Sequence, residues 1–386
     1  GEATTEGATY DRALFATRPI SIAQAIMGIK DTEIPLIVVV GVDRLVEDPL
    51  IQFHGYKCEA GIYDDDDAYD SRCDSNSDGL TDIEHGLTDD TYTEDQRNLD
   101  WWADQNDDVM EMIYVIVYRG EDIKYFGGVG DLIGGTYVVH RTQKETDSNV
   151  VIIDAYLNAL IHGVALEFEG IHIRGKTRGI ALPGSYSPTG DGDPLAKKAN
   201  IWGYVVRGGY KQPHWNVMFE HGYASGDANV ADEDFTGRPL HADHNAGLLL
   251  YEEVLARVTA NGWTDSARGL WSNGGVYNSR YIFPTASFSP LDNWELIGGF
   301  LMAWPDKPDG ALIQCKEGEE CSTANATKSH LGWELDFGIH HQFHKHILFA
   351  MEAGYAKATD RIPLETAGLN PKGNFFTFQS RIAWKF

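Results

Sequence analysis

One acidic segment of the chain has the residue spacing of a calcium-binding loop. Oxygen-bearing side chains recur at alternate positions, Gly79 allows the sharp turn of such a loop, and the carbonyl of Leu80 adds an oxygen. The usual last ligand position is His85, so Glu84 or a later acid such as Asp89 would have to supply the final carboxylate. The pattern predicts a structural Ca²⁺ site; the alternative is a solvated acidic loop without metal. The predicted ligands are Asp74, Asn76, Asp78, Leu80, Asp82 and Glu84.

The four cysteines form two close pairs in sequence. Cys58 and Cys73 flank an acidic run just before the calcium-type segment, and Cys315 and Cys321 flank a short charged stretch. None falls in a segment with strand periodicity. Because exported proteins fold in an oxidising compartment, each pair is predicted to form a local disulfide, and unpaired thiols are the alternative. On the loop-entropy model, the first closure would stabilise the fold by ~3 kcal/mol.

The remaining reactive residue types do not form a recognisable catalytic set. His340 and His341 are adjacent, so in a strand they would point to opposite faces and could not share a metal ion. Ser225 lies out of register for the Gly-x-Ser-x-Gly turn of serine hydrolases and follows no strand-to-helix elbow. We therefore expect no enzymatic activity.

Alternating apolar and polar residues dominate the chain and define the elements that carry these loops. In the last such segment, Phe376, Ile382 and Trp384 share one face, whereas Thr377 and Arg381 share the other. Segments of about ten residues with this pattern are typical of membrane-spanning β-strands. The chain 1–386 is therefore predicted to be a single all-β domain, a transmembrane antiparallel β-barrel. We expect thirteen strands, near 9–18, 34–45, 109–119, 130–141, 150–160, 163–175, 200–211, 214–224, 276–288, 293–304, 329–342, 346–357 and 374–386.

The connections between these segments alternate between tight turns and long loops. In bacterial outer-membrane barrels the short turns are periplasmic and the long loops are extracellular. The alternation predicts an acidic extracellular insertion at 46–108. It also predicts a long extracellular loop at 225–275, with a possible short helix at 246–256 that would pack on the rim or enter the pore.

The strand count has a topological implication. A single-chain bacterial barrel normally has an even number of strands, and the last strand here is predicted to end on the periplasmic side. Either one strand is miscounted, with 21–30 as the place to look, or an odd number of strands precedes Gly1. We expect about 14–18 strands in the complete barrel.

Charged residues within the strands are expected to face the interior, because a charge facing lipid at mid-bilayer costs about 2–4 kcal/mol. In segment 163–175, the change of apolar face around Gly170 predicts a bulge, which would place Arg174 inside. A polar channel and a salt-bridged interior without conduction both fit this pattern. The predicted pore-lining residues are Glu111, Arg141, Glu167, Glu169, Arg174, Arg207, Glu220, Arg280, Glu334, Asp336, His340, Glu352 and Arg381.

Several short motifs resemble known outer-membrane families. Residues 222–227 (GYASGD) resemble alginate-export-type porins, which implies about eighteen strands and a basic lumen for a polyanion. The mixed inward charges of this chain depart from that family. Residues 11–19 and 40–48 resemble a poorly characterised barrel family of myxobacteria-like Gram-negative bacteria, in which further strands precede this region. The alternating Ile382, Trp384 and Phe386 resemble the C-terminal signal read by the barrel-assembly machinery.

The net charge of −27 is unevenly distributed. Residues 46–108 hold 20 acidic and 3 basic residues, so this loop alone carries −17 and the lumen must be judged by its own charges. An acidic protein is a poor partner for nucleic acid. The leading hypothesis is a bacterial outer-membrane porin or export channel for polar solutes or oligosaccharides, embedded in outer-membrane lipid. The alternative is a surface protein whose barrel anchors a calcium-stiffened extracellular loop that contacts a protein partner.

Overall fold

The fold is taken from a computed structural model of the chain. It describes residues 9–30, 34–46, 109–125, 128–143, 148–177, 197–228, 234–241, 244, 246–259, 272, 274–308, 327–365 and 367–384.

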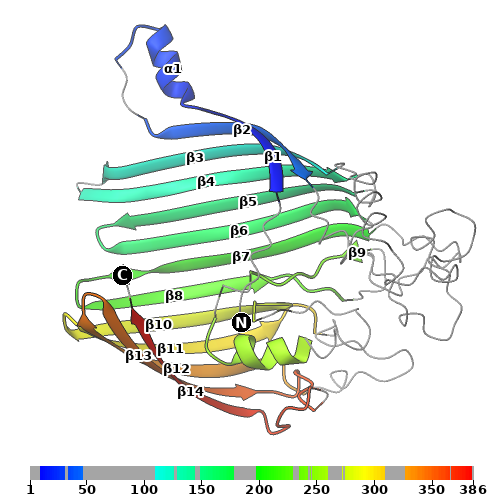
Figure 1. The fold of residues 1–386 in the computed structure, drawn as a ribbon. Coiled ribbons are helices and arrows are strands. Elements are labelled where there is room, and N and C mark those ends of the chain that lie inside the picture. Colours follow the sequence, from blue (N-terminus) through cyan, green and yellow to red (C-terminus); the bar gives the residue numbers. More distant parts are fainter. Residues whose placement is uncertain are drawn as a thin grey trace, which may run out of the picture.

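One antiparallel sheet makes up most of the molecule (Figure 1). Strands follow one another across it in chain order, and the short β9 (Asp234–Phe235) adds a parallel pairing beside β7. The other strands are β1 (Thr9–Thr17), β2 (Leu36–Val46), β3 (Met110–Tyr125), β4 (Gly128–Gln143), β5 (Ser148–Ile161), β6 (Val164–Thr177), β7 (Lys197–Lys211), β8 (Trp215–Ala224), β10 (Ser279–Leu291), β11 (Trp294–Pro305), β12 (Gly332–His344), β13 (Ile347–Ala358) and β14 (Asn374–Trp384).

Each of the thirteen segments expected from alternation corresponds to one strand of this path. Strand β9 was not predicted, because two residues are too short to show a periodicity. The described parts of the connections contain two helical elements: α1 (Pro19–Ile26) and the π-helical turn η2 (Leu250–Leu255), which continues as a helical turn to Thr259. Within the described residues, no helix is long and apolar enough to cross a membrane.

Tight turns gather at one end of the sheet. The β5–β6 hairpin turns over only His162 and Gly163, whose φ angles of 52° and 82° fit a type I′ turn. The β7–β8, β10–β11 and β12–β13 turns lie at the same end, which we call the turn end, and the opposite end is the long-loop end (Figure 1). The tight turns set the register of neighbouring strands, and local shifts occur near the turn end in the β3–β4, β10–β11 and β12–β13 pairs.

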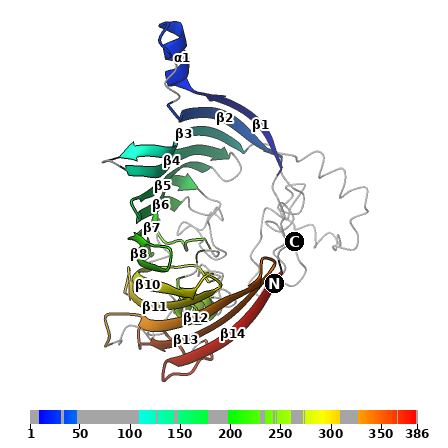
Figure 2. The same ribbon diagram turned by 90° about the vertical axis from the view of Figure 1, so that its left-hand side faces the viewer.

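The sheet curves into a trough with a concave and a convex face (Figure 2). Strands β1 and β14 form the two edges of the described sheet, and both run from the long-loop end to the turn end. Because the two edge strands run in the same direction, pairing them directly would be parallel. A barrel in which all neighbours are antiparallel would need an odd number of additional strands in the gap between β14 and β1.

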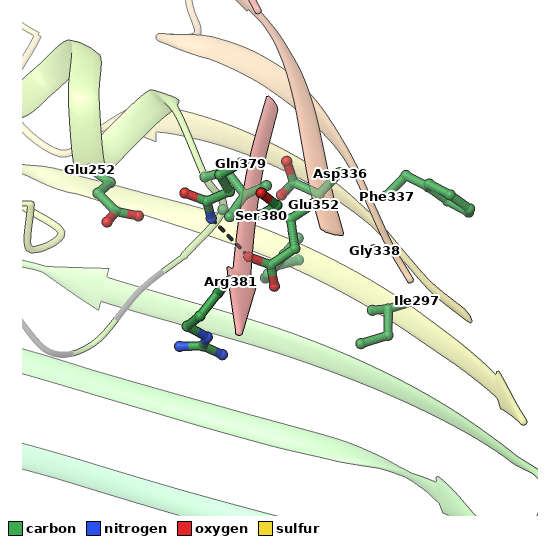
Figure 3. Close-up of a pocket in the computed structure, with 12 residues that line it drawn as sticks. Glu252, Ile297, Asp336, Phe337, Gly338, Glu352, Gln379, Ser380 and Arg381 are labelled. Carbon is green, nitrogen blue, oxygen red and sulfur yellow. Dashed lines mark hydrogen bonds between the residues drawn. The ribbon is translucent and has the colours of Figure 1, made fainter. Parts of the chain in front are cut away.

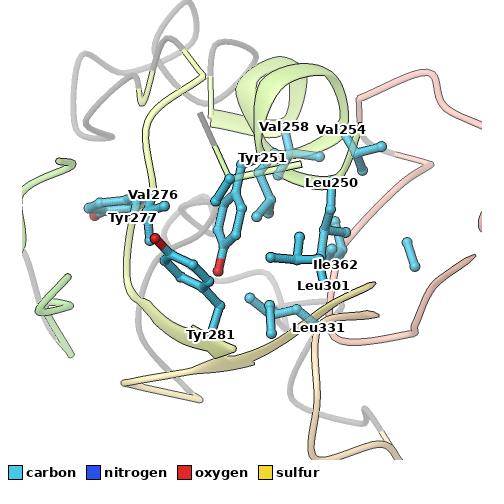
Figure 4. Packing of buried hydrophobic residues seen from close by; sticks show 14 of the residues in the cluster. Leu250, Tyr251, Val254, Val258, Val276, Tyr277, Tyr281, Leu301, Leu331 and Ile362 are labelled. Atoms are coloured by element: carbon cyan, nitrogen blue, oxygen red, sulfur yellow. The ribbon is translucent and has the colours of Figure 1, made fainter. Parts of the chain in front are cut away.

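The apolar core lies on the concave face. Leu250, Tyr251 and Val254 of the η2 segment are buried against Tyr281 of β10 and Leu301 of β11 (Figure 4). Residues 244 and 246–259 of the connection between β8 and β10, which we call the folded-in segment, thus lie inside the trough. Burial of their apolar side chains holds them there.

Candidate functional site

The convex face carries the apolar side chains that strand alternation predicts. Its aromatic residues gather in two belts, as in outer-membrane barrels. On strand β12, Trp333 lies in one belt and Phe343 lies in the other. The ten residues that separate them span about 33 Å along the strand, which at a tilt of about 40° corresponds to about 25 Å across the bilayer. The long-loop belt contains Trp202, Tyr223, Trp304, Trp333 and Tyr355, and the turn-end belt contains Tyr210, Trp215, Trp294, Phe343 and Trp384.

Ion pairs join neighbouring strands across the concave face. The Arg12 guanidinium lies 2.5 Å from the carboxylate of Asp43, which is completely buried. The Arg141 guanidinium lies 3.4 Å from the carboxylate of Glu111. In both cases the two residues are direct cross-strand partners. Opposite charges in this position stabilise the pairing and lower the net charge of the wall.

A larger polar cluster spans β6, β7, β8 and β10. The Arg207 side chain donates a hydrogen bond to Glu220 and lies 3.5 Å from Glu167. The Tyr281 hydroxyl donates to the other carboxylate oxygen of Glu220, and His244 Nε2 lies 2.7 Å from that hydroxyl. Because His244 belongs to the folded-in connection, this network ties the connection to the wall. Burial lowers the pKa of His244, so its ring is neutral near pH 7.

Glu334 of β12 makes the closest contact between the wall and the folded-in segment. Its Oε1 accepts hydrogen bonds from the backbone N–H groups of Leu248 (2.5 Å) and Leu249 (2.7 Å), and its Oε2 accepts one from Leu250 (2.7 Å). The side chain is fully buried. A carboxylate at this position satisfies the free N–H groups where η2 begins. Gly247 has φ +80° and leaves no room for a Cβ, which would lie 2.8 Å from Glu334.

Two hollows flank the folded-in segment on the concave face. The first, of about 540 Å³, lies between the segment and β12–β14 and is lined by Glu252, Asp336, Glu352, Gln379 and Arg381 (Figure 3). Gln379 donates a 2.8 Å hydrogen bond to Glu352, and both carboxylate oxygens of Asp336 are buried without a hydrogen-bond partner among the described residues. Burial raises the pKa of Glu252.

The second hollow, of about 840 Å³, lies on the other side of the segment. Strands β5–β7 form its floor, and the connection after β8 forms its wall. Acidic and basic side chains both line it, and each can hydrogen-bond a polar solute or water. They include Asp154, Glu167, Glu169, Arg207, Arg238 and His241.

Comparison with known proteins finds distant similarity to solved structures only. No protein-family model matches the chain, and no curated protein matches it. Among solved structures, a NanC porin shares 8% identity and a TM-score of 0.30, covering 72% of this chain and 94% of that one. The outer-membrane phospholipase A of Escherichia coli shares 9% identity and a TM-score of 0.25, covering 74% and 82%. The CymD monoaromatic hydrocarbon channel shares 10% identity and a TM-score of 0.25, covering 91% and 69%.

The chain folds as the wall of an outer-membrane β-barrel. This assignment rests on the sheet itself: an antiparallel meander, tight turns at one end, an apolar convex face with two aromatic belts and a charged concave face. The resemblances to alginate-export-type porins and to the myxobacteria-like family stay predictions.

Most of the charged residues predicted to share the barrel interior lie on one face. The strand register places eleven of them on the concave side, where the folded-in segment also lies. These are Glu111, Arg141, Glu167, Glu169, Arg207, Glu220, Glu334, Asp336, His340, Glu352 and Arg381.

Two predicted inward residues, Arg174 and Arg280, lie instead on the convex face. The pairing of β6 with β5 and β7 runs through Gly170 without a shift, so the expected bulge is absent and Arg174 points outward with Asn200. Arg280 pairs with the outward-facing Tyr223. Both arginines are near the long-loop ends of their strands, where a charge facing lipid costs only about 0–1 kcal/mol.

Several contacts on the concave face were not predicted from the sequence. The ion pair between Arg12 and Asp43 was not predicted, although an Asp-Arg dipeptide occurs on each of the two strands, at 11–12 and 43–44, and was a usable signal. Tyr281 was missed because an aromatic ring on a strand was assigned to the lipid side. The contact of His244 with Tyr281 was missed because His244 lies in the connection between β8 and β10, outside the alternating pattern of the strands. Tyr281 faces inward because the folded-in segment gives it an apolar neighbour there.

Other predicted site residues lie outside the described part of the chain. The calcium-type segment from Asp74 to Glu84, the pairs Cys58–Cys73 and Cys315–Cys321, and Phe386 belong to this group. The Ca²⁺ site and the two disulfides therefore stay predictions. Of the predicted assembly signal, Ile382 and Trp384 lie on the convex face of the edge strand β14.

Proposed function

We propose that this chain forms an outer-membrane channel for polar solutes, including oligosaccharides. The observation that carries the proposal is the pair of charged hollows, about 540 and 840 Å³ in volume, on either side of the folded-in segment. A barrel that served only as an anchor has no need for space bordered by Glu169, Arg207 and Glu352. Polar walls replace the hydration shell of a solute as it passes.

The folded-in segment would act as the constriction of this channel. It is held at Glu334 by three backbone hydrogen bonds, at Tyr281 by His244 and at Ser279 by Tyr251, so it is fixed to the wall at several separate points. A constriction held in this way keeps a defined width and exposes the side chains of Glu252 and Arg238 to a passing solute.

The large acidic loop at 46–108 supports a second function. A loop with a net charge of −17, closed by a Cys58–Cys73 disulfide and stiffened by Ca²⁺ at Asp74–Glu84, would suit contact with a basic protein surface outside the cell. In this function the barrel is the anchor. Assembly would proceed through the barrel-assembly machinery, which would read the outward Ile382 and Trp384 together with Phe386.

Liposome swelling tests the proposed channel. The refolded full-length protein is placed in vesicles, and uptake of neutral sugars from mono- to tetrasaccharide is measured by the fall in light scattering. The channel predicts fast uptake of small sugars and a size cut-off. Vesicles that contain folded, protease-resistant protein and swell no faster than empty ones would contradict it and favour the anchor.

A further inference from the structure

Helix α1 interrupts the pattern of tight connections at the turn end of the sheet. It joins β1 to β2 and projects away from the edge of the sheet that these two strands form (Figure 1). No charged residue occurs from Pro19 to Ile29, and the run is bracketed by Arg18 and Lys30. An uncharged run between two cations is unusual for a connection that faces only water.

The side-chain distribution of α1 is the reverse of that expected in water. Ile22, Ile26 and Met27 are 51%, 80% and 62% exposed, whereas the polar Ser21 and Gln24 are half-buried. None of the helix residues is buried. A helix in contact with water turns its apolar stripe toward the protein and its polar stripe outward. The reversed arrangement indicates that the surroundings of α1 are apolar.

The apolar side of α1 continues the apolar surface of the sheet. Phe15 of β1 is 67% exposed on the convex face, where it pairs with the exposed Val40 of β2. The helix begins two residues after β1 ends, on the turn-end side of the sheet, where the turn-end aromatic belt also lies. The belt marks the boundary between hydrocarbon and headgroups in a barrel of this type.

We propose that α1 is an interfacial anchor that lies in the lipid leaflet at the turn end of the barrel. Ile22, Ile26 and Met27 insert into the hydrocarbon boundary, while Arg18 and Lys30 meet lipid phosphates at its two ends. Lipid fits better than a protein partner, because the exposed side offers no polar group for directional recognition and each end carries a positive charge. The inference rests on the membrane placement of the proposed channel.

Photo-crosslinking of the full-length protein in vesicles of phosphatidylethanolamine and phosphatidylglycerol tests this placement. p-Benzoyl-phenylalanine is introduced separately in place of Ile26, of Gln24 as the matched position on the half-buried side, and of Phe337 as a convex-face reference. Folding of each variant is checked by protease resistance. We expect a lipid adduct at position 26 that exceeds the adduct at position 24 by at least about fivefold, and a similar adduct at position 337.

Each other outcome overturns the placement in a distinguishable way. A covalent dimer at position 26 would mean that a second copy covers α1, and a crosslink within the chain would mean that another segment does. A lipid adduct at position 337 without one at position 26 would reject the anchor and leave the proposed channel intact. Absence of lipid adducts at both positions would reject the membrane placement itself.

Discussion

The carboxylate of Glu334 accepts a 2.7 Å hydrogen bond from the backbone N–H of Leu250, a residue 84 positions away in the sequence. Together with the bonds from Leu248 and Leu249, it fixes the start of the η2 segment to strand β12. The carboxylate is therefore better described as an attachment point for the folded-in segment than as a pore-lining charge.

Replacing Glu334 is expected to release the folded-in segment. Glu334→Ala leaves three backbone N–H groups without their acceptor, at about 1–3 kcal/mol for each of the two buried ones, of Leu249 and Leu250. Limited proteolysis within 246–259 should become faster, and the current through the channel should become noisier. Glu295→Gln, which alters a concave-face carboxylate that lies 3.7 Å from His340, is the control for this release. Unchanged proteolysis in Glu334→Ala would refute the attachment.

Gly247→Ala tests the same contact from the other side. The added Cβ would lie 2.8 Å from Glu334, and the φ of +80° strains any other L residue. We expect a loss of about 1–3 kcal/mol in the stability of the docked segment, measured by hydrogen exchange of its amides. Gly208→Ala serves as the comparison, because a Cβ there meets no atom within 4 Å. Equal effects of the two substitutions would argue against a specific clamp.

The strand path could be predicted from sequence because lipid imposes a simple constraint. Outward positions in the middle of the bilayer favour apolar side chains, so residues such as Phe337 and Phe378 recur with period two and identify their strands. The same constraint weakens near the membrane surface, where Arg174 can face outward at little cost. Gly170 presents no side chain to mark a face, so the phase of β6 remained ambiguous in the sequence.

The site was harder to predict, because its main contacts are not encoded as residue pairs. Glu334 bonds to backbone N–H groups, which every residue except proline possesses, so no side-chain pattern marks the partner. A buried Tyr281 on the concave face contradicts the rule that aromatic rings face lipid, and only the folded-in segment explains it. The Arg207–Glu220 and Arg12–Asp43 pairs follow once the register is known.

The channel is predicted to prefer cations. Arg12, Arg141 and Arg207 are each already paired with an acid, whereas Asp154 and Glu169 line the larger hollow without a cation within ion-pair distance among the described residues. A wall with an acidic excess attracts cations. The reversal potential in a KCl gradient should give a cation-over-anion permeability ratio above one.

Neutralising the larger hollow should weaken that preference. The double variant Asp154→Asn, Glu169→Gln is expected to bring the permeability ratio toward one without closing the channel. Phe337→Leu, which changes only the convex face, should leave the ratio unchanged. A preference for anions in the unmodified protein would contradict the charge distribution described above.

The docking of the folded-in segment should weaken in acid. Burial holds the pKa of His244 below its ordinary 6.5, although Glu220 and Glu169 act to raise it and Arg207 acts to lower it. When the segment is released, the pKa of His244 returns to its ordinary, higher value, so a proton favours the released state. The docked state therefore keeps its full stability above pH 6.5 and loses it as the pH falls from 6.5 to the lower pKa of the docked ring. Proteolysis of the segment should therefore accelerate below pH 6.5.

Two histidine variants check this pH dependence. His244→Gln keeps a hydrogen-bonding group beside Tyr281 but cannot titrate, so its proteolysis rate should change less with pH. His214→Gln, at the exposed β7–β8 turn, should behave like the unmodified protein. An identical pH profile for His244→Gln and the parent would mean that another group controls docking.

Calcium is expected to stiffen the acidic loop. Isothermal titration of the oxidised full-length protein with Ca²⁺ should show a single tight class of site, and Asp78→Asn should weaken it by at least about tenfold. Asp95→Asn, in the same loop but outside the motif, should leave binding unchanged. If no heat is measured with the oxidised protein, the segment is a solvated loop without a metal site.

Planar-bilayer recording tests the central claim most directly, because it asks whether the concave face of this barrel is a continuous aqueous path. The refolded full-length protein in a lipid bilayer should give discrete, cation-selective current steps, and Glu334→Ala should make them noisier. Folded, membrane-inserted protein that carries no ionic current would contradict the channel and leave the barrel as an anchor for its extracellular loops.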